Sequence, residues 1–220
     1  MIIASAVLAA LPALADAPAT LSFSHAGSTV TMPMPSKYCL PQGDRQNEFA
    51  NSLKADDTRS FIYLVLMPCG EATGAYPDSF FVIKAPNSGQ YMMTPFSRAA
   101  LIAKLSAFFA ARPDLVAAMN AQAGARASEK ASRDAGTKVE MSQSAGPLGN
   151  DQDCLYVGGS LTIKANGETL PLVVAECATA VNDHLISVFQ YRANADLSAL
   201  PAMLAEVRRV AMTMKGAADK

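Results

Sequence analysis

Three short segments of the chain are apolar at nearly every position: residues 60–67 (SFIYLVLM), 79–83 (SFFVI) and 185–189 (LISVF). A strand of this kind is apolar on both faces, so it must be covered from two sides. We therefore expect these segments to lie centrally in one sheet.

Apolar residues at helical spacing predict the helices that would cover this sheet. Asp44 begins a short amphipathic stretch, Ser97 is a candidate cap for a helix ending near Arg112–Pro113, and Pro113 opens an Ala-rich helix. The polar run 125–134 (ARASEKASRD) then predicts an exposed or frayed helix end. A last helix should start at a Ser198 cap and stop at Gly216, with a stripe of Leu200, Leu204, Val207 and Ala211.

Turn residues predict hairpins between the remaining strands. Ala26–Gly27 separates two alternating segments, Asn182–Asp183 marks a turn, and Asn166–Gly167 is a strong two-residue hairpin signal. The Asn166–Gly167 turn sets a register in which Ile163 faces Leu170, Leu161 faces Leu172 and Tyr156 faces Cys177. Residues 144–151 (SAGPLGND) are expected to form a loop.

This order of strands, helices, strands and a terminal helix predicts an α+β fold: a mainly antiparallel central sheet with helices on both faces. We expect residues 18–220 to form a single domain. The Ala-, Gly- and Ser-rich region 121–150 is the only candidate boundary, and we interpret it as a flexible excursion within that domain.

Residues 1–17 resemble a secretory signal peptide, with an apolar run from Ile2 to Leu14 and the small-residue motif Ala15-Asp16-Ala17. A buried N-terminal helix is the alternative, although Pro12 would interrupt it. The signal predicts an exported protein, periplasmic if the source is Gram-negative. No segment reaches the roughly 20 apolar residues of a membrane-spanning helix.

Four cysteines in an exported chain predict two disulfides, and Cys39, Cys69, Cys154 and Cys177 allow three pairings. We favour Cys39 with Cys69 and Cys154 with Cys177, because the hairpin register places Cys154 diagonally from Cys177 if Gly158–Gly159 bends the strand. No pair has the C-x-x-C spacing of redox or zinc motifs.

Three motifs together resemble a known group. They are MPMPSKYCLP (32–41), VLMPC (65–69) and the late strand and helix LISVFQYRANADLSALPAMLAEV (185–207). They are similar to exported bacterial proteins of uncharacterised function and to the PsbP-like and DcrB-like α/β/α sandwich. The resemblance implies an antiparallel sheet between helical layers, and it brings no catalytic residues with it.

The charge balance gives no sign of a nucleic-acid partner. The chain has 18 basic and 19 acidic residues, and removing Asp16 with residues 1–17 leaves 18 of each. We found no nucleophile-elbow, zinc-protease, P-loop or dinucleotide-binding motif, and we expect no cofactor.

Three groups of residues remain as site candidates. His184 with Asp183 would serve a hydrolase, as base and orienting group.

Asn150, Asp151 and Asp153 offer oxygen ligands but lack EF-hand spacing, so we interpret them as a solvated loop and expect no metal. Tyr91, Met92, Met93 and Phe96 suit an adaptable apolar groove, and they are our candidate ligand-binding residues.

The function that fits these features is a non-enzymatic exported protein that binds a protein partner or a small apolar ligand in the cell envelope. A hydrolase using His184 and Asp183, and a structural envelope component, are the alternatives.

Overall fold

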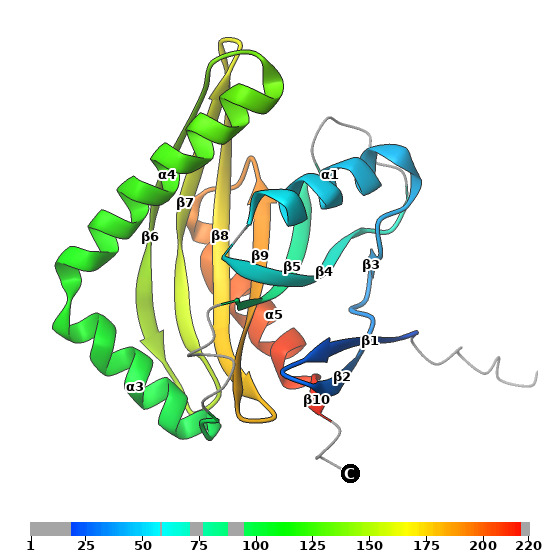
Figure 1. The fold of residues 1–220 in the computed structure, drawn as a ribbon, viewed down its shortest axis with the longest axis vertical. Helices are drawn as coiled ribbons and strands as arrows, with labels where there is room; N and C mark the ends of the chain where they lie inside the picture. The colour runs from blue at the N-terminus through cyan, green and yellow to red at the C-terminus, as the bar shows by residue number, and fades with distance from the viewer. Residues whose placement is uncertain (1–18, 58, 71–76, 88–94, 217–220) are drawn as a thin grey trace, which may run out of the picture.

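The computed structural model describes residues 19–57, 59–70, 77–87 and 95–216. Within these ranges the main element is a seven-stranded sheet in the order β3-β4-β5-β9-β8-β7-β6, in which every neighbouring pair is antiparallel (Figure 1). Its strands are β3 (Tyr38–Cys39), β4 (Ser60–Pro68), β5 (Ser79–Pro86), β6 (Val139–Asn150), β7 (Leu155–Ala165), β8 (Glu168–Val181) and β9 (His184–Ala193).

The apolar segments predicted to be central are β4, β5 and β9, and β5 and β9 pair with one another inside the sheet. The predicted hairpin register is confirmed, since Ile163 pairs with Leu170, Leu161 with Leu172 and Tyr156 with Cys177. Asn166 and Gly167 both have positive φ, at 52° and 82°, as a turn that matches the twist of the strands requires.

One face of the sheet is covered by helix α5 (Leu200–Met212) and by a small second sheet. The small sheet contains β1 (Thr20–His25), β2 (Ser28–Pro33) and β10 (Lys215–Gly216), so it joins the two ends of the described chain. The core on this side combines Val30 and Met32 of the small sheet, Phe81 and Val188 of the large sheet and Val207 of α5.

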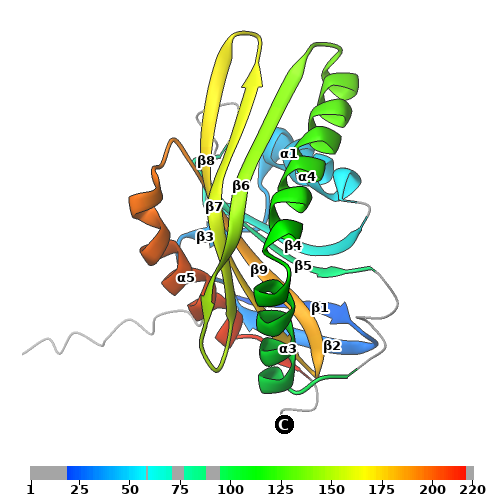
Figure 2. The same cartoon turned by 90° about the vertical axis from the view of Figure 1, so that its left-hand side faces the viewer.

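Helices α1 (Gly43–Asp56), α3 (Arg98–Ala111) and α4 (Pro113–Ala135) lie over the opposite face, so helices cover both faces as predicted (Figure 2). Phe49 and Leu53 of α1 pack on Val65, Phe80 and Val82 at the β4–β5 end of the sheet. Helices α3 and α4 follow the other side, near β6 and β7 (Figure 1). The fold class is therefore the α+β sandwich expected from the sequence.

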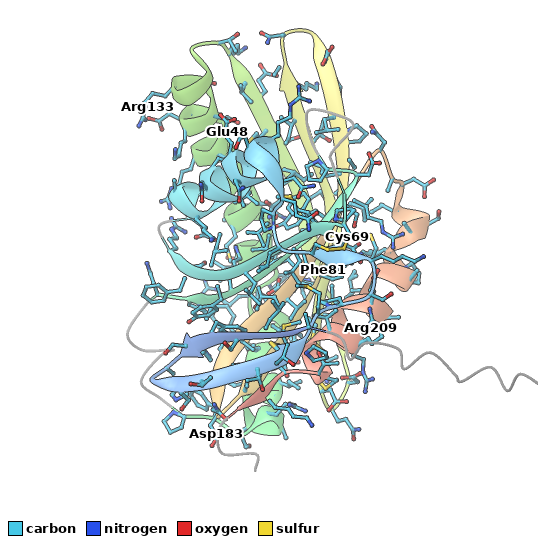
Figure 3. The ribbon with its side chains drawn as sticks, turned by 90° about the vertical axis from the view of Figure 1, so that its right-hand side faces the viewer. Glu48, Cys69, Phe81, Arg133, Asp183 and Arg209 are labelled. Carbon is cyan, nitrogen blue, oxygen red and sulfur yellow. A yellow bond between two sulfur atoms is a disulfide. The ribbon has the colours of Figure 1, made fainter. Side chains whose placement is uncertain are left out.

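The predicted cysteine pairing is confirmed. Cys39 and Cys69 form one disulfide and Cys154 and Cys177 the other, with Cα–Cα distances of 5.0 and 5.2 Å; Cys69 is labelled in Figure 3. The first ties β3 to the segment after β4, and the second ties the start of β7 to the middle of β8. Each closes a loop long enough to contribute roughly 3.5 kcal/mol by the chain-entropy estimate.

Gly158 and Gly159 are needed for close packing, which the sequence interpretation of a bend did not include. A Cβ at Gly159 would lie 1.9 Å from the carbonyl oxygen of Ser144 on β6, and one at Gly158 would lie 2.8 Å from Leu200 of α5. The pair of glycines therefore lets β7 approach β6 on one side and α5 on the other.

Several details of the helices and loops differ from the sequence predictions. Of the two expectations for 125–134, exposure is confirmed at Ala125, Arg126, Glu129 and Arg133, but the helix does not fray: α4 continues to Ala135, and Gly136 ends it with φ of 62°. The helical spacing of Leu101, Leu105 and Phe108 predicts that all three face the sheet, but Phe108 is 46% exposed, whereas Leu101 is buried. Ser97 does cap α3, accepting a hydrogen bond from the backbone N–H of Ala100.

The other two corrections concern residues 144–151 and α5. Most of the predicted loop is strand, because β6 runs to Asn150 as the edge of the sheet, where Pro147 need not donate a ladder hydrogen bond. Helix α5 follows a short 3₁₀ turn, η1 (Leu197–Ala199), capped by Asp196 instead of Ser198. The helix ends at Met212, and Gly216 lies in β10.

Region 121–150 forms the second half of α4 and most of β6, and these two elements are joined by side-chain hydrogen bonds. Ser132 Oγ donates to the carbonyl of Val139 and accepts from its N–H at 2.8 Å, and Ser128 Oγ accepts from the N–H of Met141 at 2.7 Å. Asn120 donates to a carbonyl further along β6. Side chains of α4 thus satisfy backbone groups at the edge of the sheet.

Among the described residues, no helix combines the length and the apolar character needed to cross a membrane.

We predict that Gly124→Ala destabilises the protein. Helix propensity alone would give a gain of up to about 1 kcal/mol, but a Cβ at position 124 would lie 2.8 Å from the carbonyl oxygen of Met141. We expect a net loss of about 1–3 kcal/mol in the free energy of unfolding, measured by urea titration. As a control, Ala125→Gly at the adjacent exposed position should lose only the propensity, about 1 kcal/mol. A more stable Gly124→Ala protein would contradict the close packing of α4 on β6.

Candidate functional site

Of the four ligand-binding residues predicted from the sequence, Tyr91, Met92 and Met93 lie outside the described residues. Phe96 is half-buried next to the β8–β9 turn. Its backbone N–H donates to the carbonyl of Asp183 at 2.6 Å, and the ammonium of Lys104 lies 4.6 Å from its ring centroid. Phe96 therefore contacts α3 and the turn.

His184 and Asp183 lie at the tip of the β8–β9 hairpin, and Figure 3 labels Asp183 at the end of the molecule where the small sheet lies. Asp183 has φ of 62° and belongs to the turn. Nδ1 of His184 is buried and has no hydrogen-bond partner among the described residues. A hydrolase would need Asp183 to orient His184 through a hydrogen bond. This bond is not formed among the described residues.

His184 instead faces His25, which the sequence placed only at a hairpin tip. The His25 ring is fully buried, its Nδ1 lies 2.9 Å from the hydroxyl of Tyr63, and its centroid is 6.0 Å from that of His184. Its Nε2 lacks a well-aligned partner within the described ranges. Burial lowers the pKa of His25, the charge of His184 lowers it further, and the backbone of His184 only partly offsets both.

We predict a loss of stability on mild acidification that depends on His25. Because the folded pKa lies below the ordinary value of 6.5, the unfolded chain binds the proton first as the pH falls. The free energy of unfolding should therefore decrease from pH 6.5 downward until the folded pKa is passed, with a slope of at most about 1.4 kcal/mol per pH unit from one proton.

Urea titrations between pH 7.5 and pH 5 measure this slope, and His25→Gln should flatten it. Asp151 does not interfere, since its folded pKa of about 2 and its ordinary value of 3.8 both lie below this range. Glu176, whose pKa burial raises, acts in the opposite direction but is present in both proteins, so the difference between the two slopes reports on His25. An equal slope in the wild type and in His25→Gln would assign the pH dependence to other groups.

The acidic residues of the GNDQDC motif are paired with arginines, which the solvated-loop interpretation missed. Arg208 of α5 donates to both Asp151, at 3.0 Å, and Asp153, and Arg98 of α3 lies 3.4 Å from Asp153. Although desolvation acts in the opposite direction, hydrogen bonds from Tyr156, two backbone N–H groups and Arg208 lower the pKa of Asp151 to about 2. Within the described ranges, no group of three or more metal-ligating side chains occurs.

The most extensive hollow among these candidates lies where α1, α3 and α4 leave the sheet incompletely covered. Two adjoining cavities of about 240 and 390 Å³ occupy this gap, and we call them together the trough. Strands β5, β9, β8 and β7 form the floor, and α3 and α4 form one wall. Both cavities are lined by Lys84, Phe109, Val157, Glu176 and Phe189.

Strand alternation explains which side chains reach the trough. Phe189 and Tyr191 of β9 and Val174 and Glu176 of β8 are spaced two residues apart, so they point to the same face of the sheet. Val188 of β9 points to the opposite face, into the core beneath α5. Apolar residues of the central strands thus form the floor of the trough, and residues of α3, α4 and the edge strand β6 complete its lining.

Two charged side chains rise from this apolar floor. Lys84 Nζ lies 2.7 Å from a carboxylate oxygen of Asp57 and 4.7 Å from the ring centroid of Phe189. Burial by itself lowers the pKa of Lys84, but Tyr191 and Asp57 outweigh it and the pKa is raised. Lys84 is therefore held as a cation.

For Glu176, in contrast to Lys84, the surroundings disfavour the charged form. Burial raises its pKa, and the hydrogen bond from Ser187 and the charge of Lys84 only partly offset this. Its carboxyl group is therefore easier to protonate than an exposed glutamate. The trough combines apolar walls, a fixed cation and a titratable carboxyl group, an arrangement typical of binding sites.

A signal for this site was present in the sequence. Lys84 is the only charged residue of β5, SFFVIKAP, and Glu176 is the only one between Thr169 and Val181 of β8. Isolated charges in strands that are otherwise apolar indicate a polar function on one face. The sequence interpretation used these strands only to place the core.

Comparisons with known proteins give a loose structural likeness and no sequence match. No protein-family model matches the chain, and no curated protein matches it. Among solved structures, the solution structure of cyanobacterial PsbP (CyanoP) from Synechocystis sp. PCC 6803 is similar, with a TM-score of 0.40 and 9% sequence identity over 94% of this chain and 97% of that one. This is a loose match to the PsbP-like group that the sequence motifs suggested, and at this score it carries no information about function.

Proposed function

We propose that this chain is an exported, non-enzymatic protein that binds a small apolar ligand in the trough. The observation that carries the proposal is the trough itself. It lies on the sheet face between α1 and the α3–α4 pair, its floor comes from central strands, and its larger part has a volume of about 390 Å³. That volume falls within the range of small-molecule sites.

A small ligand suits this site better than a docked protein segment. The trough is bounded by α3 and α4 on one side, and Arg59 and Lys84 line it on the other. A protein partner or a structural assembly would more naturally use an exposed, continuous surface. These two alternatives become outcomes of the experiments below.

Export is supported by the apolar stretch of residues 1–17 and by the paired cysteines. Disulfides persist in oxidising compartments, and both pairs here close loops within one domain. The periplasm is the proposed compartment if the source is Gram-negative.

We predict that the purified protein binds Nile red, an uncharged apolar dye, with saturable fluorescence, and that Ala123→Trp abolishes most of this binding. Ala123 of α4 lines the trough, so an indole there would fill it. Ala125→Trp, on an exposed position of the same helix outside the trough, is the matched control and should bind the dye as the wild type does.

Equal loss of binding in both tryptophan variants, with unchanged circular dichroism, would remove the trough as the site. No saturable binding in any variant would favour the protein-partner or structural alternatives, and co-purification from envelope extracts would then separate these two.

We also predict that residues 1–220, produced in a Gram-negative host, appear in the periplasmic fraction without residues 1–17. Mass spectrometry of the unreduced product should detect no alkylatable thiol, because all four cysteines are paired. Residues 18–220 produced alone should stay in the cytoplasm and serve as the control. A full-length product that remains cytoplasmic, with residues 1–17 attached, would contradict export.

A further inference from the structure

The charges around the trough restrict the kind of ligand that fits it. Its charged lining residues, within the described part of the chain, are Arg59, Lys84 and Glu176. Lys84 is already paired with Asp57, which lies behind it and does not line the trough. Arg59 and Glu176 are therefore the groups whose charge a ligand would meet.

Arg59 is an exposed cation at the border of the larger cavity. Its backbone N–H donates to Asp57 at 3.2 Å, which fixes the chain at this point, while its guanidinium group has no salt-bridge partner among the described residues. A guanidinium group offers several donors in a planar fork that matches a carboxylate. Among the described residues no carboxylate pairs with this group, so it is available to an anion at the border of the trough.

Glu176 lies deeper, between Val157 and Phe189 on the apolar floor. The apolar surroundings disfavour its ionised form, which raises its pKa. The amide side chains of Asn120 and Gln143 also line the larger cavity, and they add polar character without charge.

We propose that the ligand is a single-chain amphiphile with a carboxylate head, bound with its chain along the apolar floor and its head at Arg59. This inference rests on the proposed function and adds the head group to it. Arg59 lines the larger cavity without a salt-bridge partner among the described residues, so a carboxylate head would find a partner there and a cationic head would be repelled. An uncharged head would leave the guanidinium group of Arg59 unused.

Displacement of Nile red by three compounds with the same twelve-carbon chain tests the inference: dodecanoate, dodecanol and dodecylamine. We expect dodecanoate to displace the dye at about tenfold lower concentration than dodecanol, and dodecylamine to be the weakest. The preference should decrease as salt is added, because Arg59 is exposed to solvent.

Arg59→Gln should remove most of the difference between dodecanoate and dodecanol while the dye still binds. Arg45→Gln is the matched control, since Arg45 is an exposed arginine of α1 outside the trough and its loss changes the net charge equally. The control should keep the preference for dodecanoate.

The outcomes separate this inference from the function on which it rests. Equal displacement by dodecanoate and dodecanol, or a preference that survives Arg59→Gln, would overturn the head-group assignment and leave the apolar site intact. Tightest binding of dodecylamine would also overturn it and would point to ionised Glu176 as the partner. Failure of the dye and of all three compounds would overturn both proposals.

Discussion

The structure depends on one constraint: the central strands β5, β8 and β9 are apolar on both faces, so both faces of the sheet must be covered. Helix α5 and the small sheet cover one face, and side chains such as Phe81, Val188 and Val207 are fully buried there. The other face is covered by α1 at one end and by α3 and α4 at the other. The trough is the part of this second face that these helices cover incompletely, with α3 and α4 forming one of its walls.

A second constraint operates at the edge of the sheet. Strand β6 is a long edge strand, and an uncovered edge of this kind invites pairing with another chain. Helix α4 covers it through residues four apart, Asn120, Gly124, Ser128 and Ser132, which lie on one side of the helix. Two serine hydroxyls bond to backbone groups of β6, and the glycine allows the helix to come close. The polar run 125–134 thus contains the two serines whose hydroxyls bond to backbone groups of β6.

Much of the fold could be predicted because its signals are local. The Asn166–Gly167 turn set the β7–β8 register correctly, and that register placed Cys154 within reach of Cys177. Turn chemistry and alternation are properties of neighbouring residues, so one sequence is enough to recognise them. The same holds for the cap at Ser97 and for the helix opened by Pro113.

The elements that were missed depend on partners far away in the sequence. The sequence predicted a solvated loop at Asp151 and Asp153. Their partner Arg208, which binds both, is more than fifty residues away, so nothing nearby in the sequence indicated the pairing. His25 gave no signal of burial, since only the docking of the small sheet brings it against Tyr63 and His184. Export was read from residues 1–17 and the cysteines, and it stays a prediction.

The trough contains one residue that costs stability. A carboxyl group on an apolar floor costs stability, because burial disfavours its charged form and an apolar side chain would pack there without that penalty. Lys84 is different, since Asp57 compensates its burial. Glu176 has only Ser187 and the more distant charge of Lys84 to offset the cost. Local choices that disagree with stability are expected at functional sites, and Glu176 is such a choice on the face that the helices leave uncovered.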